Sequence, residues 1–238
     1  MSRRLEVAPT RSDIEDRVAE ELITVIQSAL ASRERADIVV TGGTVGIGVL
    51  ASLARSPHAA TIDWSCVHVW WGDERFVPAG HTDRNEKQAK DVLFSQIAIP
   101  ASNLHTFPAD RGQTLRDARD EFLAEHVDGF PAFDVVLNGI GHDGHAASLF
   151  PGLPHGGGED VIAVENSPKP PAQRLTFTFD ALNRGRRVWI VASGTDKSAA
   201  VARIFAGAHE SETPAAALRG TLETVVWVDA DAASELPG

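Results

Sequence analysis

Apolar residues recur at helical spacing near the start of the chain. Between positions 12 and 32 they fall three or four residues apart, which is typical of one buried helix face. These positions are Ile14, Val18, Leu22, Ile26 and Leu30. Ser12 and Glu15 have the residue types and spacing of a capping box. The pattern therefore predicts a helix over 12–32 that begins at Ser12.

Short runs rich in valine and isoleucine alternate with further helical patterns along the rest of the chain. The runs predict buried strands at 37–41, 67–71, 133–139, 174–179, 187–192 and 224–228. The helical patterns fall at about 46–55, 84–96, 113–127 and 196–206. Strands that alternate with helices form βαβ units and a parallel sheet. We expect one α/β domain over 1–238, with a mainly parallel sheet covered on both faces.

Composition narrows the class of protein. The 238 residues are 43% hydrophobic and 23% charged, as in ordinary globular proteins. Cys66 is the only cysteine, which favours a reducing compartment. The N-terminus lacks the apolar run of a signal peptide, and no stretch is apolar enough for a membrane helix. We therefore expect a cytoplasmic protein with no membrane partner.

The formal net charge of −11 bears on partners. A surface of this sign repels a phosphate backbone, so a nucleic-acid partner is not expected. A small anion needs only a local cluster of donors, and the charge total does not exclude one. The sequence leaves the oligomeric state open and is compatible with a monomer.

Glycines follow the first predicted strand at once, in Thr41-Gly42-Gly43-Thr44-Val45-Gly46. Glycines let the backbone approach an anion, and the helix that follows offers free N–H groups and a positive dipole end, so a phosphate fits here. A tight turn without a ligand is one alternative. A dinucleotide site is another, because Gly46-x-Gly48-x-x-Ala51 is a loose form of its fingerprint, although these glycines fall inside the predicted helix.

Charged residues follow the second predicted strand, where Asp73, Glu74 and Arg75 come directly after Gly72. Acids and an arginine are costly to bury unpaired. The planar guanidinium of Arg75 suits oxyanions. We therefore expect these residues at the strand end, where they either meet a ligand or form a surface salt bridge.

Two histidines and an aspartate lie among glycines in the third segment, 138–152. Histidine is the commonest residue for proton transfer near neutral pH, and backbone N–H groups of 139–144 offer an oxyanion hole. A metal site is the competing interpretation, with His142, Asp143 and His145 as ligands and His155 as the nearest fourth. In a parallel sheet the three segments are expected to meet at the carboxyl ends of the strands.

Nucleophilic catalysis is not indicated. The chain contains no Gly-x-Ser-x-Gly elbow, so His155 and the glycines after it are not expected to be an esterase's oxyanion strand. Cys66 begins an apolar strand pattern and is expected to pack in the core. The five tryptophans are expected in the core too, and at most one of Trp70 and Trp71 can face a pocket.

Taken together, the motifs carry a family resemblance. The strings TGGT at 41–44, WWGDERFVP at 70–78 and NGIGHDGHAASLFPG at 138–152 resemble the glucosamine-6-phosphate isomerase/6-phosphogluconolactonase family, and its lactonases in particular. Asp83, Asn85, Arg174-Leu-Thr-Phe-Thr and Gly194-Thr-Asp-Lys197 extend the resemblance over roughly 37–205. It departs at the first loop, where the family's usual form resembles Ser-Gly-Gly-Ser-Thr-Pro; losing the proline makes this loop less rigid.

The resemblance implies a Rossmann-like three-layer sandwich related to the glucosamine-6-phosphate deaminase fold. It implies hydrolysis of 6-phospho-D-glucono-1,5-lactone in the oxidative pentose phosphate pathway, with no metal or cofactor. His145 would be the general base, and Asp143 and Asp73 would orient it or bind substrate hydroxyls. The residues implied around the substrate phosphate are Gly42, Gly43, Thr44, Arg75, Arg174 and Lys197.

Three other functions compete with the lactonase. In an amino-sugar phosphate isomerase or deaminase the active-site string resembles DGHIAFNEPG, with a glutamate five residues after the histidine, where this chain has Phe150. The strand-end motif of that enzyme resembles DEY, and Arg75 stands here in place of its tyrosine. A non-catalytic sugar-phosphate sensor would carry a DNA-binding segment, whereas one helix precedes Asp37 and the chain is acidic. The hypothesis of a dehydrogenase depends only on the glycine pattern near Gly46.

Overall fold

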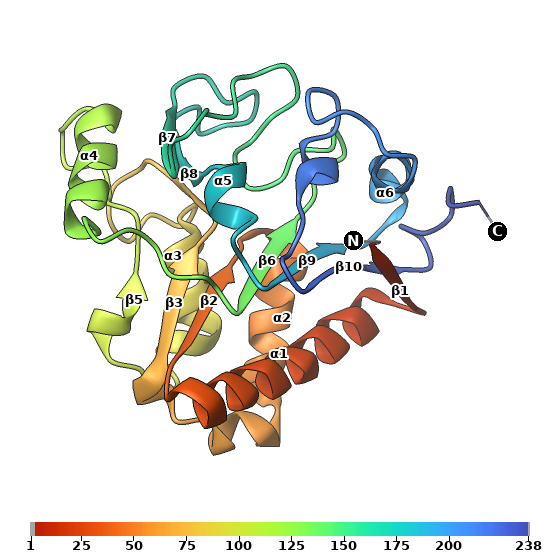
Figure 1. Ribbon diagram of the computed structural model, residues 1–238, viewed down its shortest axis with the longest axis horizontal. Coiled ribbons are helices and arrows are strands. Elements are labelled where there is room, and N and C mark those ends of the chain that lie inside the picture. Colours follow the sequence, from red (N-terminus) through yellow and green to blue (C-terminus); the bar gives the residue numbers. More distant parts are fainter. Residues whose placement is uncertain (1–2, 238) are drawn as a thin grey trace.

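A seven-stranded parallel sheet forms the centre of the computed structural model, which describes residues 3–237 (Figure 1). Its strand order is β1-β10-β9-β6-β2-β3-β5. The strands are β1 (Arg4–Ala8), β2 (Ala36–Val40), β3 (Val67–Trp71), β5 (Leu104–His105), β6 (Val135–Gly139), β9 (Arg187–Ala192) and β10 (Glu223–Asp229). The mainly parallel α/β sheet that the sequence predicted is confirmed.

Helices cover both faces of this sheet. They are α1 (Arg11–Arg33), α2 (Gly43–Arg55), α3 (Asn85–Ala89), α4 (Leu115–Glu125), α5 (Phe179–Leu182) and α6 (Ser198–Phe205). In Figure 1, α1 and α2 lie on one side of the sheet, and α4, α5 and α6 lie on the other. Within the described chain, no helix combines the length and the apolar character needed to cross a bilayer.

A second, smaller sheet of antiparallel strands lies on the side of α4 and α5 (Figure 1). Its order is β4-β8-β7, formed by β4 (Asp73–Arg75), β8 (Arg174–Phe177) and β7 (Val161–Val164). β4 follows β3 after the single residue Gly72, and Asp73 pairs with Thr176 of β8. This sheet therefore brings the segment around Arg174 to the carboxyl end of β3.

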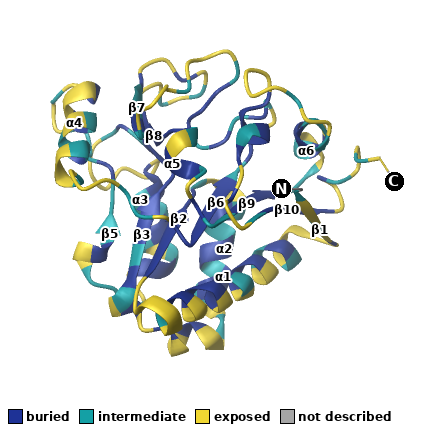
Figure 2. Ribbon diagram, viewed as in Figure 1, coloured by how far each residue is buried: buried dark blue, intermediate teal, exposed yellow. Residues whose placement is uncertain are grey.

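The core lies along both faces of the central sheet. All five residues of β2 are buried, as are all but one residue each of β6 and β9, and this produces the near-continuous dark centre of Figure 2. A parallel sheet buried on both faces requires such apolar runs. On α1 the predicted helical stripe faces the core, with Ile14, Val18, Leu22 and Ile26 buried. All five tryptophans are buried, as expected.

Several predicted boundaries and pairings differ from the structure. The capping box of α1 uses Thr10 and Asp13, not Ser12 and Glu15, because the helix begins at Arg11. The predicted strand 174–179 lies in the small antiparallel sheet rather than the parallel one, because it pairs with β4 and β7. The predicted helix 84–96 is α3 followed by a π-helical turn over Lys90–Phe94.

The chain also contains strands that the sequence patterns did not predict: β1, β4, β5 and β7. β5 has only two residues, and β1 is an edge strand with mixed exposure, so neither has an apolar run long enough to stand out. Cys66 was expected in the core but is half-buried, at the end of a 3₁₀ turn where its Sγ lies near Asp63.

The glycines that resembled a dinucleotide fingerprint lie inside α2, as the sequence indicated. A Cβ on Gly48 would come 2.1 Å from Oε1 of Glu15, so this glycine allows α1 and α2 to pack closely. A Cβ on Gly46 would come 2.7 Å from the carbonyl oxygen of Thr41. Packing explains both residues without a nucleotide.

The helix cap supplies a test of the fold. Thr10→Ala removes the side chain that accepts the N–H of Asp13, and we expect the free energy of unfolding to fall by about 1 kcal/mol. Ser12→Ala changes an exposed residue inside the first turn, and we expect a change within about 0.5 kcal/mol. Denaturant unfolding of both variants measures the difference; equal losses would contradict the observed cap.

Candidate active site

The carboxyl ends of β2 and β6 form a crevice. From β2 the chain proceeds to β3 and β5 on one side, and it then returns to β6 on the other side of β2. Such a reversal of strand order is the usual ligand site of an open parallel sheet. The loops that follow β2, β3 and β6 all converge here, as the sequence predicted.

A cleft of about 460 Å³ opens at this crevice, which is within the range of small-molecule sites. It continues into a narrower recess of about 120 Å³. Both parts are lined by Gly42, Gly43, Arg75, Gly139, Ile140, His145 and Arg174. The wider part adds Thr44, Lys169 and Lys197, and the recess adds Asp73 and Asn85.

The N-terminus of α2 forms one wall of the cleft. Gly42 is the N-cap of this helix, and Gly43 is its first residue with φ of 80°. The first N–H groups of a helix have no partner within it, and they carry the positive end of its dipole. A Cβ on Gly42 would come 1.9 Å from Oδ1 of Asn85, so glycine lets that side chain pack against the loop. The wall is suited to an anion.

His145 and Asp143 form a hydrogen-bonded pair beside the cleft, which we call the dyad. Nδ1 of His145 lies 2.6 Å from Oδ1 of Asp143. A carboxylate can only accept a hydrogen bond, so the proton of the neutral imidazole is on Nδ1 and the lone pair is on Nε2. A Cβ on Gly141 would come 2.0 Å from Nδ1 of His145, so the pair depends on glycine at that position.

Opposing effects act on Asp143. Partial burial raises its pKa, but the hydrogen bond and electrostatic interaction with His145, together with the ammonium of Lys169, lower the pKa by more. The net pKa of Asp143 lies well below its usual range, so this carboxyl stays ionised. It is therefore a fixed negative charge that orients the imidazole.

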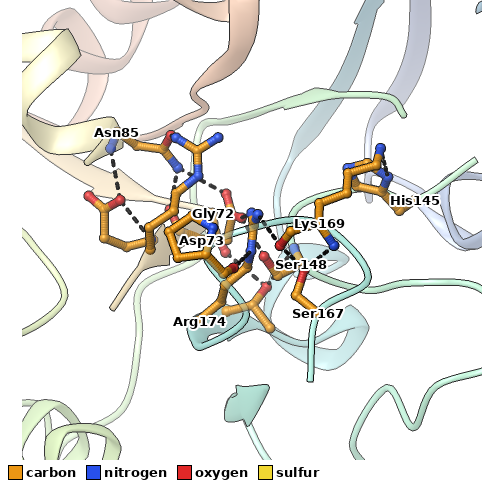
Figure 3. A network of polar contacts seen from close by, with 12 residues as sticks. Gly72, Asp73, Asn85, His145, Ser148, Ser167, Lys169 and Arg174 are labelled. Atoms are coloured by element: carbon orange, nitrogen blue, oxygen red, sulfur yellow. Dashed lines mark hydrogen bonds and ion pairs between the residues drawn. The ribbon is translucent and has the colours of Figure 1, made fainter. Parts of the chain in front are cut away.

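Asp73 belongs to the same polar network as His145 but is joined to it only through Arg174 and Lys169 (Figure 3). Its carboxylate accepts hydrogen bonds from Oγ of Ser148 at 2.6 Å and from Nδ2 of Asn85 at 3.2 Å. Nη1 of Arg174 lies 3.8 Å away. Asp73 thus ties three segments together below the cleft, and the contact with His145 belongs to Asp143 alone.

Glu74 fixes the position of Asn85 from the other side. This carboxylate is 2% exposed and accepts N–H groups of Asn85 and Glu86 at 2.8 and 2.9 Å, at the start of α3. Burial raises the pKa of Glu74 to about 7, although Arg84 and the backbone donors lower it in part. Asn85 in turn accepts a hydrogen bond from Nη1 of Arg75 at 2.7 Å.

The guanidinium of Arg174 is hydrogen-bonded to the neighbouring backbone. Its Nε donates to the carbonyl oxygen of Pro171 at 3.1 Å, and Nη2 donates to those of Lys169 and Pro170 at 3.2 Å each. Its guanidinium also lies 5.8 Å from the ring centre of Phe150. Arg174 therefore contributes charge to the cleft and holds the loop that carries Lys169.

Lys197 lies at the opposite rim, in the 3₁₀ turn Thr195–Lys197 after β9. Its Nζ is 2.8 Å from the exposed carboxylate of Asp196. Lys197 pairs only with this surface carboxylate among the described residues, and it lines the wider part of the cleft.

The structure does not assemble the metal site considered from the sequence. His142 is exposed and does not line the cleft, and Nε2 of His155 lies 2.8 Å from the carbonyl oxygen of Phe150. Over residues 3–237, no group of three or more histidine, cysteine or acidic side chains is arranged to hold a metal ion.

Sequence reasoning missed Lys169, which stands between Pro168 and Pro170 and whose contact with His145 spans 24 positions of sequence. It placed Glu74 at a strand end but did not identify its partners, which lie 11 and 12 residues away. The tryptophans are the opposite case, because neither Trp70 nor Trp71 reaches the cleft. Trp70 stacks on His105 instead.

Comparisons with known proteins agree with this geometry. The chain is 43% identical over its whole length to the whole of a 6-phosphogluconolactonase of Mycobacterium leprae. It superposes with a TM-score of 0.85 on the crystal structure of 6-phosphogluconolactonase from Thermotoga maritima, which is 27% identical and covers 96% of this chain and 100% of that one.

The fold is shared more widely. A monomeric glucosamine-6-phosphate deaminase, 19% identical, superposes with a TM-score of 0.81 over 98% of this chain and 99% of its own, which confirms the expected fold relation. The model of the glucosamine-6-phosphate isomerases/6-phosphogluconolactonase family matches residues 9–227. This chain therefore belongs to the glucosamine-6-phosphate isomerase/6-phosphogluconolactonase family.

Proposed function

We propose that this chain hydrolyses 6-phospho-D-glucono-1,5-lactone to 6-phosphogluconate, the lactonase step of the oxidative pentose phosphate pathway. The observation that carries the proposal is the dyad, whose imidazole lines a cleft that also holds a helix N-terminus and cations. Relatives named 6-phosphogluconolactonase, one of them 43% identical over the whole chain, support the same substrate.

The reaction needs a base but no covalent intermediate, because a lactone is already a reactive ester. Nε2 of His145 accepts a proton from water while the water oxygen bonds to the lactone carbonyl carbon. The tetrahedral oxyanion collapses as the bond from that carbon to the ring oxygen breaks, and the imidazolium returns its proton to the ring oxygen. The new carboxylic acid then ionises and releases one proton to solvent.

Backbone N–H groups of the loop after β6 are the candidates to stabilise the oxyanion. Gly139, Ile140 and Gly141 all line the wider cleft. The N–H of Gly141 already donates to the carbonyl oxygen of His145 at 2.9 Å, so the remaining amides of this loop are the candidates. Each well-placed donor contributes about 10²–10³ in rate.

The phosphate of the substrate fits the wider end of the cleft. Gly43 and Thr44, at the start of α2, and Lys197 all line this part of the cleft, and the first N–H groups of a helix attract an anion. Arg75 and Arg174 add positive charge, but their hydrogen bonds to neighbouring residues make them less available as direct ligands. The recess with Asp73 and Asn85 is left for sugar hydroxyls.

We further propose that one domain carries this activity in the cytoplasm, with the sugar lactone as its partner and no metal or cofactor. Support comes from the single half-buried thiol, Cys66, and from a cleft whose groups suffice for the reaction.

The role of His145 is tested by replacement. In His145→Asn we expect proton release from 6-phosphogluconolactone, corrected for spontaneous hydrolysis, to slow by about 10²–10⁴-fold. His142→Asn is the matched control, because His142 is exposed and outside the cleft, and it should keep the wild-type rate. A loss below about tenfold in His145→Asn would exclude this residue as the base.

Replacement of Asp143 and of Asp73 is expected to change different kinetic constants. Asp143→Asn removes the charge that fixes the Nδ1–H form of His145, so kcat should fall roughly tenfold or more with a smaller change in KM. Asp73→Asn disturbs the network of Ser148 and Arg174, so it should lower stability and raise KM. Initial rates over a range of lactone concentration decide; the reverse pattern would exchange the two roles.

The phosphate assignment predicts a substrate-dependent effect. Lys197→Met should raise KM for the phosphorylated lactone about tenfold, because an ionic hydrogen bond is lost, and should leave kcat nearly unchanged. With unphosphorylated glucono-1,5-lactone the same variant should match the wild type. An equal loss with both substrates would place the phosphate elsewhere.

A further inference from the structure

Lys169 is a charged residue in contact with both members of the dyad. Its Nζ lies 3.2 Å from Nδ1 of His145 and 3.6 Å from Oδ1 of Asp143 (Figure 3). It comes from a loop 24 residues further along the chain.

The backbone of Lys169 is held on both sides. Oγ of Ser167 accepts its N–H at 3.2 Å and donates to its carbonyl oxygen at 2.9 Å. Nη2 of Arg174 donates to the same carbonyl oxygen at 3.2 Å. These contacts fix the point from which the Lys169 side chain extends toward the dyad.

The contact with His145 is electrostatic. Because Nδ1 carries the proton donated to Asp143, the ammonium of Lys169 has no lone pair to bind on that nitrogen. A carboxylate beside an imidazole favours the protonated imidazolium, which cannot act as a base. A cation at the same distance disfavours it. The two charges therefore act on His145 in opposite directions.

The other charged groups of the cleft are not in direct contact with His145. The cations Arg75 of β4, Arg174 of β8 and Lys197 and the carboxylates of Asp73 and Asp196 line the same cleft, but no hydrogen bond or ion pair joins them to His145 in the described chain. Phe150 packs on the imidazole with ring centres 4.7 Å apart and carries no charge.

The pKa of Lys169 is lowered overall. Partial burial is the largest cause, Lys197 and Arg174 lower the pKa as well, and Asp143 raises it only in part. Removing Asp143 therefore removes the partner of both Lys169 and His145.

We propose that Lys169 is a positioning residue that opposes protonation of His145, so that the imidazole beside the Asp143 carboxylate stays neutral and able to take a proton. The inference deepens the proposed lactonase function and rests on it. Because Lys169 acts through His145, its effect depends on pH, which a purely structural or substrate-binding role would not produce.

The first test uses the ligand-free protein and NMR. The imidazole resonances of His145 are assigned by their loss in His145→Asn and titrated with pH in the wild type and in Lys169→Met. We expect the midpoint of the His145 titration to rise by about one pH unit in Lys169→Met, because the nearest cation is gone. Lys169→Arg keeps the charge and should leave the midpoint close to wild type.

Lys87→Met is the matched control. Lys87 is a lysine paired with Asp91 on the surface, outside the cleft, and its replacement should move neither the titration nor the activity. Circular dichroism and thermal unfolding establish that each variant is folded. Lys169→Gln, which keeps a polar side chain, repeats the measurement if the methionine variant does not fold.

The second test is the pH profile of kcat/KM with 6-phosphogluconolactone. In Lys169→Met the acidic limb should move up by about one pH unit, so the variant is about tenfold slower below the limb and near wild type above it. Lys169→Arg should restore the wild-type profile. An unchanged NMR midpoint, or a loss equal at every pH, would overturn the proposal.

These outcomes are distinct from failure of the proposed function. The NMR titration reports on Lys169 and His145 without any substrate. If His145→Asn retains full lactonase activity, the base assignment fails whatever the titration shows. If His145→Asn is inactive and the titration does not move in Lys169→Met, only the role of Lys169 fails.

Discussion

The chemistry of the cleft depends on one hydrogen bond, between Nδ1 of His145 and Oδ1 of Asp143 at 2.6 Å. It fixes which ring nitrogen carries the proton, and so leaves Nε2 with its lone pair. The bond exists because Gly141 has no side chain, since a Cβ there would overlap both partners. The N–H of Gly141 also donates to the carbonyl oxygen of His145, which closes the loop on itself. A short glycine-rich loop at a strand end thus becomes a rigid support for a base.

Charge is distributed unevenly between the surface and the cleft. The chain carries a formal net charge of −11, yet Lys169, Arg174 and Lys197 gather around one opening. Burying Arg174 is offset by three backbone carbonyl oxygens and by Asp73. A net negative charge repels polyanions in general, while the cations of the cleft attract a small anion. One composition therefore serves both properties, because only the local arrangement of charges acts on a small ligand.

The fold alone does not choose between a lactonase and a deaminase, since both occur on it. The choice rests on side chains near His145. Phe150, at the position where the deaminase motif has an acid, is buried against the imidazole and Arg174. The carboxylates that line the described cleft are Asp73 and Asp196; the first is committed to a network and the second pairs with Lys197. These features favour hydrolysis by one base over isomerisation.

Local pattern predicted much of the protein. Apolar runs located β2, β3, β6, β9 and β10, the helical stripe located α1, and glycines at strand ends located the loops that meet in the cleft, because these features depend on neighbouring residues in sequence. The motif around His145 gave the family. The sequence alone did not distinguish Asp143 from Asp73, because both are acids in a strand-end loop and only distance to the imidazole separates them.

Contacts between distant segments decided the rest. β8 lies outside the parallel sheet because it pairs with β4, a strand of three residues whose sequence carries no strand pattern. The loop carrying Lys169 reaches His145 while Arg174 of β8 and Ser167 hold its backbone. The sequence by itself determined the parallel fold, the family and the base candidate, which depend on local spacing. Tertiary structure decided which charges surround that base, because electrostatic contacts depend on distance in space and not on separation along the chain.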